Sequence, residues 1–189
     1  VTQAPQRVHL SLMIAFFSVG ETSVAVQWSS GVNPVWTEYR VELATSADFG
    51  GTLTSGSWEA FTSTTLVGLT RDTTYWARVT ARGISGVLSA PLSLGATATL
   101  AAVPAAAGTP FTAVAVSSLT AAWTGNGNPP DTLYEAVVST EAVQPDGGAD
   151  ETRVGTRSVS GAGFSGLTAN STHTLFVRAC CQSFQNLLV

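Results

Sequence analysis

Residues 23–43 read SVAVQWSSGVNPVWTEYRVEL, and this stretch indicates the fold class. Two runs within it alternate apolar residues with smaller or polar ones: Val24, Val26 and Trp28, and then Tyr39, Val41 and Leu43. A period of two residues is typical of a β-strand that buries one face. Between the runs, Asn33-Pro34 is a turn signal. The stretch therefore predicts two strands joined by a turn.

The same pattern returns 95 residues later. Trp28 aligns with Trp123, Asn33-Pro34 with Asn128-Pro129, and Tyr39 with Tyr134. After a three-residue insertion the offset becomes 98, which aligns residues 66–69 with 164–167 and residues 79–81 with 177–179. Self-similarity at a fixed period indicates one structural unit that is used twice.

The repeat and its strand patterns predict an all-β fold made of two tandem β-sandwiches of the seven-strand type. We expect the first sandwich at residues 15–100 and the second at residues 110–189. An Ala/Pro-rich linker is predicted at 101–109, and residues 1–14 are predicted to be an N-terminal extension or a donor strand.

Composition excludes some classes of partner. Charged residues make up only 11% of the chain, the formal net charge is -4, and all eight cationic residues are arginine. A nucleic-acid partner requires clustered positive charge to displace counterions from phosphates, so none is expected. No apolar run reaches the 18 residues or so of a membrane-spanning helix, so no transmembrane span is expected.

The order of aromatic residues resembles the fibronectin type III family, an immunoglobulin-like β-sandwich. Four core positions carry the resemblance in the first repeat: Trp28, Tyr39, Leu69 and Tyr75. Their counterparts in the second repeat are Trp123, Tyr134, Leu167 and His173. The resemblance implies that the Tyr75 hydroxyl bonds back to the backbone as a tyrosine corner. Because His173 replaces that tyrosine, the second repeat departs from the family pattern.

The second repeat is also short at its end. About 25 residues follow Tyr75 in the first repeat, whereas only 16 residues follow His173. The second sandwich is therefore predicted to lack most of its last strand. Such a gap leaves backbone groups unpaired and an apolar groove open.

The N-terminal segment offers a candidate donor for this gap. Val8, Leu10, Leu12 and Ile14 alternate with other residues and share one face of a predicted strand. One hypothesis is that this strand completes the second sandwich of another molecule, which would build a head-to-tail filament. The alternatives are that residues 8–14 form the first strand of their own domain, or that the sequence stops short of the natural C-terminus.

The residues give little support for catalysis. The chain has two histidines, His9 and His173, and neither lies in a recognisable catalytic motif. The adjacent pair Cys180-Cys181 makes a poor zinc site, and the strand pattern places Cys180 outward, either as an inert thiol or as one half of an intermolecular disulfide. We predict no catalytic residue, no cofactor and no metal ligand.

Three surface features suggest further binding or modification sites. The carboxylates of Asp146, Asp150 and Glu151 suit either a solvated loop or a Ca²⁺ site. Asn170-Ser171-Thr172 fits the glycosylation pattern. Exposed tryptophans among Trp36, Trp58 and Trp76 could either stack on a glycan or protein ligand, or pack against loops of their own chain.

Taken as a sequence, the chain is expected to be a non-catalytic structural protein of the extracellular space or cell surface, assembled with itself into an open filament by β-strand addition. The alternative is a binding or spacer module of a larger secreted adhesin or carbohydrate-active enzyme.

Overall fold

The computed structural model describes residues 15–141, 151–156 and 161–180, the second range by its backbone alone. The chain divides into two compact units, Val1–Leu100 (unit 1) and Ala101–Val189 (unit 2). Every regular element in the described ranges is a β-strand, so the predicted all-β fold of tandem sandwiches is confirmed.

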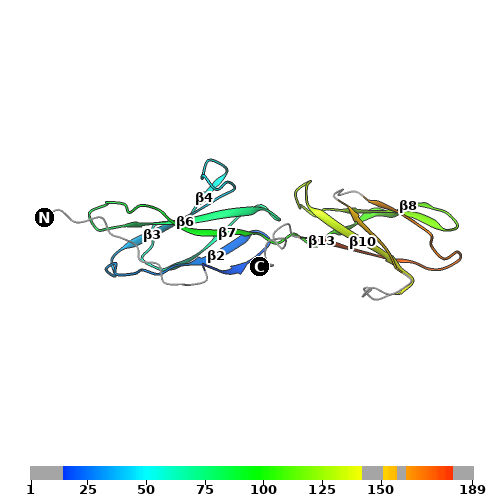
Figure 1. The fold of residues 1–189 in the computed structure, drawn as a ribbon, viewed down its shortest axis with the longest axis horizontal. Helices are drawn as coiled ribbons and strands as arrows, with labels where there is room; N and C mark the ends of the chain where they lie inside the picture. The colour runs from blue at the N-terminus through cyan, green and yellow to red at the C-terminus, as the bar shows by residue number, and fades with distance from the viewer. Residues whose placement is uncertain (1–14, 142–150, 157–160, 181–189) are drawn as a thin grey trace. The chain divides into compact units, whose positions relative to one another are not determined.

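Unit 1 contains two antiparallel sheets (Figure 1). The first has the order β1-β2-β5, with β1 at Phe16–Val19, β2 at Ser23–Gln27 and β5 at Ser63–Val67. The second has the order β4-β3-β6-β7, with β3 at Glu38–Ala44, β4 at Leu53–Ser55, β6 at Thr74–Arg82 and β7 at Leu92–Ala98. Non-consecutive strands therefore lie side by side in both sheets, as in a sandwich.

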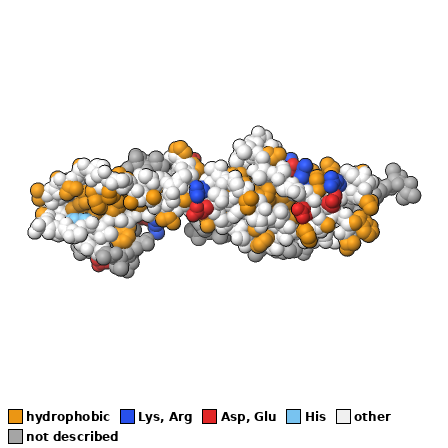
Figure 2. All heavy atoms as spheres, turned by 180° about the vertical axis from the view of Figure 1, so that it is seen from behind, with side chains coloured by type: hydrophobic (Ala, Val, Ile, Leu, Met, Phe, Trp, Pro, Cys, Tyr) orange, Lys and Arg blue, Asp and Glu red, His pale blue; other side chains and the backbone are white. Residues whose placement is uncertain are grey.

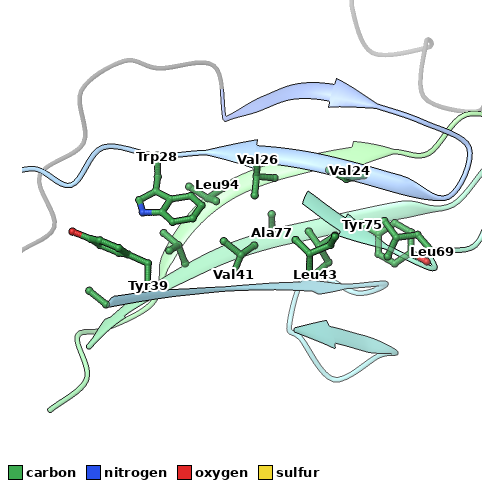
Figure 3. Packing of buried hydrophobic residues seen from close by; sticks show 13 residues of the cluster. Val24, Val26, Trp28, Tyr39, Val41, Leu43, Leu69, Tyr75, Ala77 and Leu94 are labelled. Atoms are coloured by element: carbon green, nitrogen blue, oxygen red, sulfur yellow. The ribbon is translucent and has the colours of Figure 1, made fainter. Parts of the chain in front are cut away.

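The core of unit 1 lies between its two sheets. Figure 3 shows Val24, Val26 and Trp28 pointing from the first sheet toward Val41 and Leu43 of the second. Alternate residues of each strand point into this layer. The two-residue period of the sequence therefore predicts which residues form the core. Val24, Val26 and Leu43 have no exposed surface.

Unit 2 repeats this arrangement. One sheet has the order β12-β9-β8, with β8 at Ala105–Val114, β9 at Ser118–Thr124 and β12 at Ala162–Ser165. The other has the order β11-β10-β13, with β10 at Leu133–Ser139, β11 at Glu151–Thr156 and β13 at Thr174–Cys180. Its core cluster includes Trp123, Tyr134 and Phe164.

The predicted linker at 101–109 differs from the structure, because β8 begins at Ala105. Ala105 pairs with Thr124 of β9, and Ala106 pairs with Trp123. Pro110 lies where the register of this pairing shifts, between Ala106 and Phe111. Proline is tolerated at such irregular positions because it has no N–H to donate. The Ala/Pro-rich segment therefore forms an irregular strand. Only residues 101–104 lie between unit 1 and the start of β8.

The β4-β3-β6-β7 sheet of unit 1 and the β11-β10-β13 sheet of unit 2 differ at one edge. In unit 1, β7 pairs with the outer side of β6. In unit 2, β13 pairs with β10 in the same register, but no described strand lies on its other side. We call this side of β13 the open edge.

Candidate functional site

Each of the two units has a pair of aromatic residues in contact in its core. The rings of Trp28 and Tyr39 have centroids 5.7 Å apart and an interplanar angle of 57°. In unit 2, Trp123 and Tyr134 repeat this tilted contact at 6.2 Å and 55°. Tilted aromatic contacts of this kind add to the free energy of burial. These residues therefore serve the core in both units.

The units differ at the position of the expected tyrosine corner. In unit 1, the hydroxyl of Tyr75 accepts a hydrogen bond of 3.0 Å from the backbone N–H of Thr70, and Leu69 beside it is buried. In unit 2, Nδ1 of His173 lies 3.1 Å from the carbonyl oxygen of Ser171. Leu167 packs against the core only in part. Where Tyr75 bonds to the backbone N–H of Thr70, the histidine makes only a local contact within its own loop.

The Asn-Pro turn of unit 2 holds the chain where it enters the unit. The side chain of Asn128 accepts a hydrogen bond of 2.7 Å from the N–H of Ala102, and its Nδ2 donates to the carbonyl oxygen of Ala102 at 2.9 Å. Nδ2 also lies within 3.2 Å of the Tyr134 hydroxyl. We call this arrangement the clasp. It satisfies both backbone groups of Ala102, which is only 1% exposed.

Asn126 adds a second contact to the same segment, since its Nδ2 donates to the carbonyl oxygen of Val103 at 3.0 Å. Sequence reasoning identified Asn128-Pro129 as a turn and missed the clasp. The available signal was the fixed spacing of asparagine and tyrosine in both repeats, because the two side chains bond to each other in both units.

The open edge lies beside an apolar groove of about 390 Å³. Side chains of β8, β9 and β13 line it, among them Phe111, Trp123 and Leu175, and His173 stands at its border. Figure 2 shows orange side chains gathered around the pale-blue histidine. Leu175, Val177 and Ala179 are only half-buried, whereas their counterparts in β6, Ala77, Val79 and Ala81, are at most 3% exposed. In unit 1, β7 pairs with β6, and Leu94 of β7 belongs to the same core cluster as those three residues.

Comparisons with known proteins agree with this geometry. Residues 5–94 match the family model described as "Fibronectin type III domain". A two-domain fibronectin type III segment of chicken tenascin is similar in structure, with a TM-score of 0.58 and 18% identity over 93% of this chain and 90% of that one.

The chain is a tandem pair of fibronectin type III-like repeats.

The family model covers unit 1, and unit 2 is similar to it in fold and in its repeated core residues. A computationally redesigned β-sandwich protein is also similar, with a TM-score of 0.37 and 24% identity over 53% of this chain and 92% of that one. No curated protein matches the chain. Fibronectin type III domains are typically extracellular structural or binding modules, and the fold is generally non-catalytic. Within the described residues, no helix has the length and apolar character needed to cross a bilayer.

On one sheet face of the first fibronectin type III-like unit, charged and aromatic side chains form a cluster that the sequence did not reveal. Glu42, 6% exposed, pairs with Arg40 at 3.1 Å and with Arg78 at 2.7 Å. Arg82 pairs with Glu38 at 2.6 Å. Figure 2 shows blue and red side chains side by side on this unit. The charges are thus matched within the face.

Two arginines of this cluster contact the ring of Trp58. The guanidinium carbons of Arg40 and Arg82 lie 4.9 Å and 4.5 Å from the centre of its ring, as cation–π contacts require. Trp58 is therefore engaged by its own unit. Trp76 is half-buried on β6, whereas Trp36 is 59% exposed in the Asn-Pro loop. Of the three tryptophans, Trp36 is the one that presents most surface to a partner.

The remaining predicted positions are placed as follows. Cys180 is a free thiol, half-buried at the end of β13. Asn170 is exposed in a loop with a φ of 55°. The donor positions Val8, Leu10, Leu12 and Ile14 lie outside the described residues, as do His9, Cys181, Asp146, Asp150 and the side chain of Glu151. No group of three or more His, Cys, Asp or Glu side chains in the described ranges could hold a metal ion.

Proposed function

We propose that this chain is a non-catalytic spacer segment of a larger secreted protein, in which fibronectin type III-like units are joined through a short junction. The observation that supports this proposal best is the anchoring of the chain on both sides of Ala101. On one side, Leu100 donates its N–H to Gly20 at 3.0 Å and accepts from Asp72 at 3.2 Å, both in unit 1. On the other side, the clasp holds Ala102 in unit 2.

A single residue therefore lies between two fixed points of the backbone. A flexible linker gains its reach from many freely rotating residues, and Ala101 offers only one pair of free torsions. Such a junction limits how far apart along the chain the anchored ends of the two units can lie. A restricted junction suits a spacer, which has to keep the parts on either side of it at a defined separation.

A length change at the junction tests this proposal. Insertion of Gly-Ser-Gly-Ser after Ala101 should broaden the distribution of distances in small-angle X-ray scattering, because the units are then free to reorient. The same insertion after Gly86, in an exposed loop of unit 1, serves as the control and should leave that distribution narrow. Equally broad distributions for the unmodified chain and for the junction insertion would contradict the spacer proposal.

A second candidate function is a filament subunit, favoured by the open edge and its groove. An edge strand beside exposed apolar side chains can accept an added strand, whose backbone bonds supply affinity and whose alternate side chains fill the groove. The candidate donor is the run of Val8, Leu10, Leu12 and Ile14 from another molecule. Cys180 at the end of β13 could then crosslink neighbouring subunits, and Trp36 could contact a protein or glycan ligand.

Sedimentation velocity distinguishes the two candidates. A filament subunit forms polymers that grow with concentration and disappear when residues 1–14 are deleted. A spacer sediments as a single species of one molecular mass at each concentration, with or without those residues.

A further inference from the structure

Two loops lie side by side at one end of unit 1 and contain no charged residue. One loop, residues 29–36, connects β2 to β3, and the other, residues 83–91, connects β6 to β7. They are neighbours because Glu38 pairs with Arg82 where β3 begins and β6 ends. The side chains of Arg82 and Glu38 form an ion pair of 2.6 Å at the base of the loops, so these two charges are matched. We call residues 29–36 and 83–91 the end loops.

The end loops carry large apolar side chains that face solvent. Six of these side chains are more than half exposed: Val32, Val35, Trp36, Ile84, Val87 and Leu88. Val32, Val35 and Ile84 are 87%, 88% and 84% exposed, so they project beyond their neighbours. Figure 2 shows orange side chains at this end of unit 1. A contiguous apolar surface of this kind marks a site for a protein or a membrane.

The fold itself does not require apolar residues at these positions. The offset of 95 aligns Val32, Val35 and Trp36 with Gly127, Pro130 and Asp131 of unit 2. The loop of unit 2 nevertheless closes as that of unit 1 does, through a backbone bond from threonine to proline of 3.1 Å in unit 2 and 2.9 Å in unit 1. The apolar side chains of unit 1 are therefore not needed to build the loop.

We propose that the end loops of unit 1 insert into the interface of a lipid bilayer whose headgroups carry no net charge. Side chains that project singly would each need a separate pocket in a rigid protein, whereas fluid acyl chains close around them. Tryptophan is favoured at the level of the headgroups, and aliphatic side chains are favoured at the boundary with the acyl chains. Anionic lipid offers no further attraction, because the end loops have no Lys or Arg and the chain has a net charge of -4.

The backbone of the end loops suits an apolar environment. An N–H or C=O group that leaves water needs a partner within the protein, because lipid offers none. The N–H of Asn33 donates to Ser30 at 3.1 Å. In the other loop, Gly86 donates to Gly83 at 2.9 Å, and Gly83 donates to Val87 at 3.1 Å. Each end loop therefore supplies backbone partners for its own turn.

A third loop limits the depth of insertion. The loop between β4 and β5 reaches the same end of unit 1, because Glu59 forms a bridge with Tyr39. It presents the exposed ring of Phe61 and the exposed residue Glu59. A carboxylate is costly in hydrocarbon, so this loop stays at the level of the headgroups. Only the tips of the two end loops then reach the acyl chains.

The inference goes beyond the proposed spacer function and does not depend on it. Figure 3 shows Trp28 and Tyr39 at the end of the core where the end loops begin, and Tyr75 and Leu69 at the other end. The chain leaves unit 1 at that other end, since Ala98 of β7 pairs with the start of β6. Binding of the end loops to lipid therefore leaves the junction at Ala101 unchanged, and either proposal can fail without the other.

Flotation of the intact chain with phosphatidylcholine vesicles tests the inference. We expect binding, and an affinity lower by about tenfold or more in Val35→Asp, because a carboxylate then has to enter the interface. Ile84→Asp changes the other loop and should have the same effect. Val116→Asp is the matched control: Val116 is 80% exposed in a loop of unit 2, and its substitution should leave the affinity unchanged. Phosphatidylserine in the vesicles should not strengthen binding.

Quenching by brominated phosphatidylcholine reports the contact in the unmodified chain, so it does not depend on the folding of the aspartate variants. Bromine on the acyl chains should quench the fluorescence of Trp36. Trp36→Phe should remove most of this quenching, while the chain still binds the vesicles.

An intact chain that does not bind phosphatidylcholine vesicles would overturn the inference. Equal losses of affinity in Val35→Asp and Val116→Asp would also overturn it, as would binding that appears only with phosphatidylserine. Oligomers that form without lipid and disappear in Val35→Asp, together with no binding to vesicles, would show that the end loops contact a second copy of the chain instead.

Discussion

The hydroxyl of Tyr75 and the backbone N–H of Thr70 form a hydrogen bond of 3.0 Å that closes the loop between β5 and β6. Tyr75 is only 3% exposed, and removing its hydroxyl takes this acceptor away from the N–H of Thr70. We expect Tyr75→Phe to lower the free energy of unfolding of unit 1 by about 1–3 kcal/mol. Chemical denaturation followed by NMR signals of each unit measures this effect. An unchanged unit 1 would show that the corner bond contributes nothing to stability.

The tyrosine that unit 2 lacks can be introduced at His173. Thr168 occupies the place in unit 2 that Thr70 has in unit 1. His173→Tyr should therefore create the missing corner bond and stabilise unit 2 by about 1 kcal/mol. His173→Phe supplies a ring of similar size without the hydroxyl and is the matched control. If both variants have the same midpoint of unfolding, packing rather than the hydrogen bond accounts for the change.

The carboxylate of Glu42 forms ion pairs with two arginines on the sheet face of unit 1. Its side chain is 8% exposed, while those of Arg40 and Arg78 are 35% and 30% exposed, so solvent partly screens the pairs. Glu42→Gln removes the charge and keeps the shape, and should destabilise unit 1 by about 1–3 kcal/mol. Glu135→Gln in unit 2 is the comparison, because its partner Arg178 is 62% exposed. That change should cost at most about 1 kcal/mol. Equal costs would show that burial does not strengthen the Glu42 pairs.

Asp48 should titrate abnormally. Hydrogen bonds from the Ser46 hydroxyl, at 2.6 Å, and from the Gly50 N–H, at 3.0 Å, lower the pKa of its carboxyl below the usual range. A lowered pKa in the folded state means that the bonds stabilise the fold above the unfolded pKa, and that this contribution is lost as pH falls through the folded pKa. NMR titration should show a lowered pKa that rises again in Ser46→Ala. A pKa that is the same in both proteins would contradict the assignment of its cause.

The sequence predicted the fold well because the sandwich core follows a short local period. Val24, Val26 and Trp28 alternate along one strand, and their repeat at Trp123 identified the second unit. The start of β8 was harder to predict, since Ala105 and Ala106 have little strand propensity and are held there by their pairing with β9.

The candidate sites depend on contacts between distant residues, which no local pattern encodes. The clasp joins Asn128 to Ala102, and the engagement of Trp58 follows from the register that places Arg40 and Arg82 on neighbouring strands. That unit 2 lacks most of its last strand stays a prediction, because the described residues end with β13.

The central claim is that two fibronectin type III-like units are joined through a junction with one unanchored residue, Ala101. Residual dipolar couplings measured separately for the two units of the intact chain test this claim most directly. The account predicts that both sets of couplings fit alignment tensors of the same magnitude, because the units reorient together. A markedly smaller alignment for one unit than for the other would show that the junction is freely flexible and would contradict the spacer proposal.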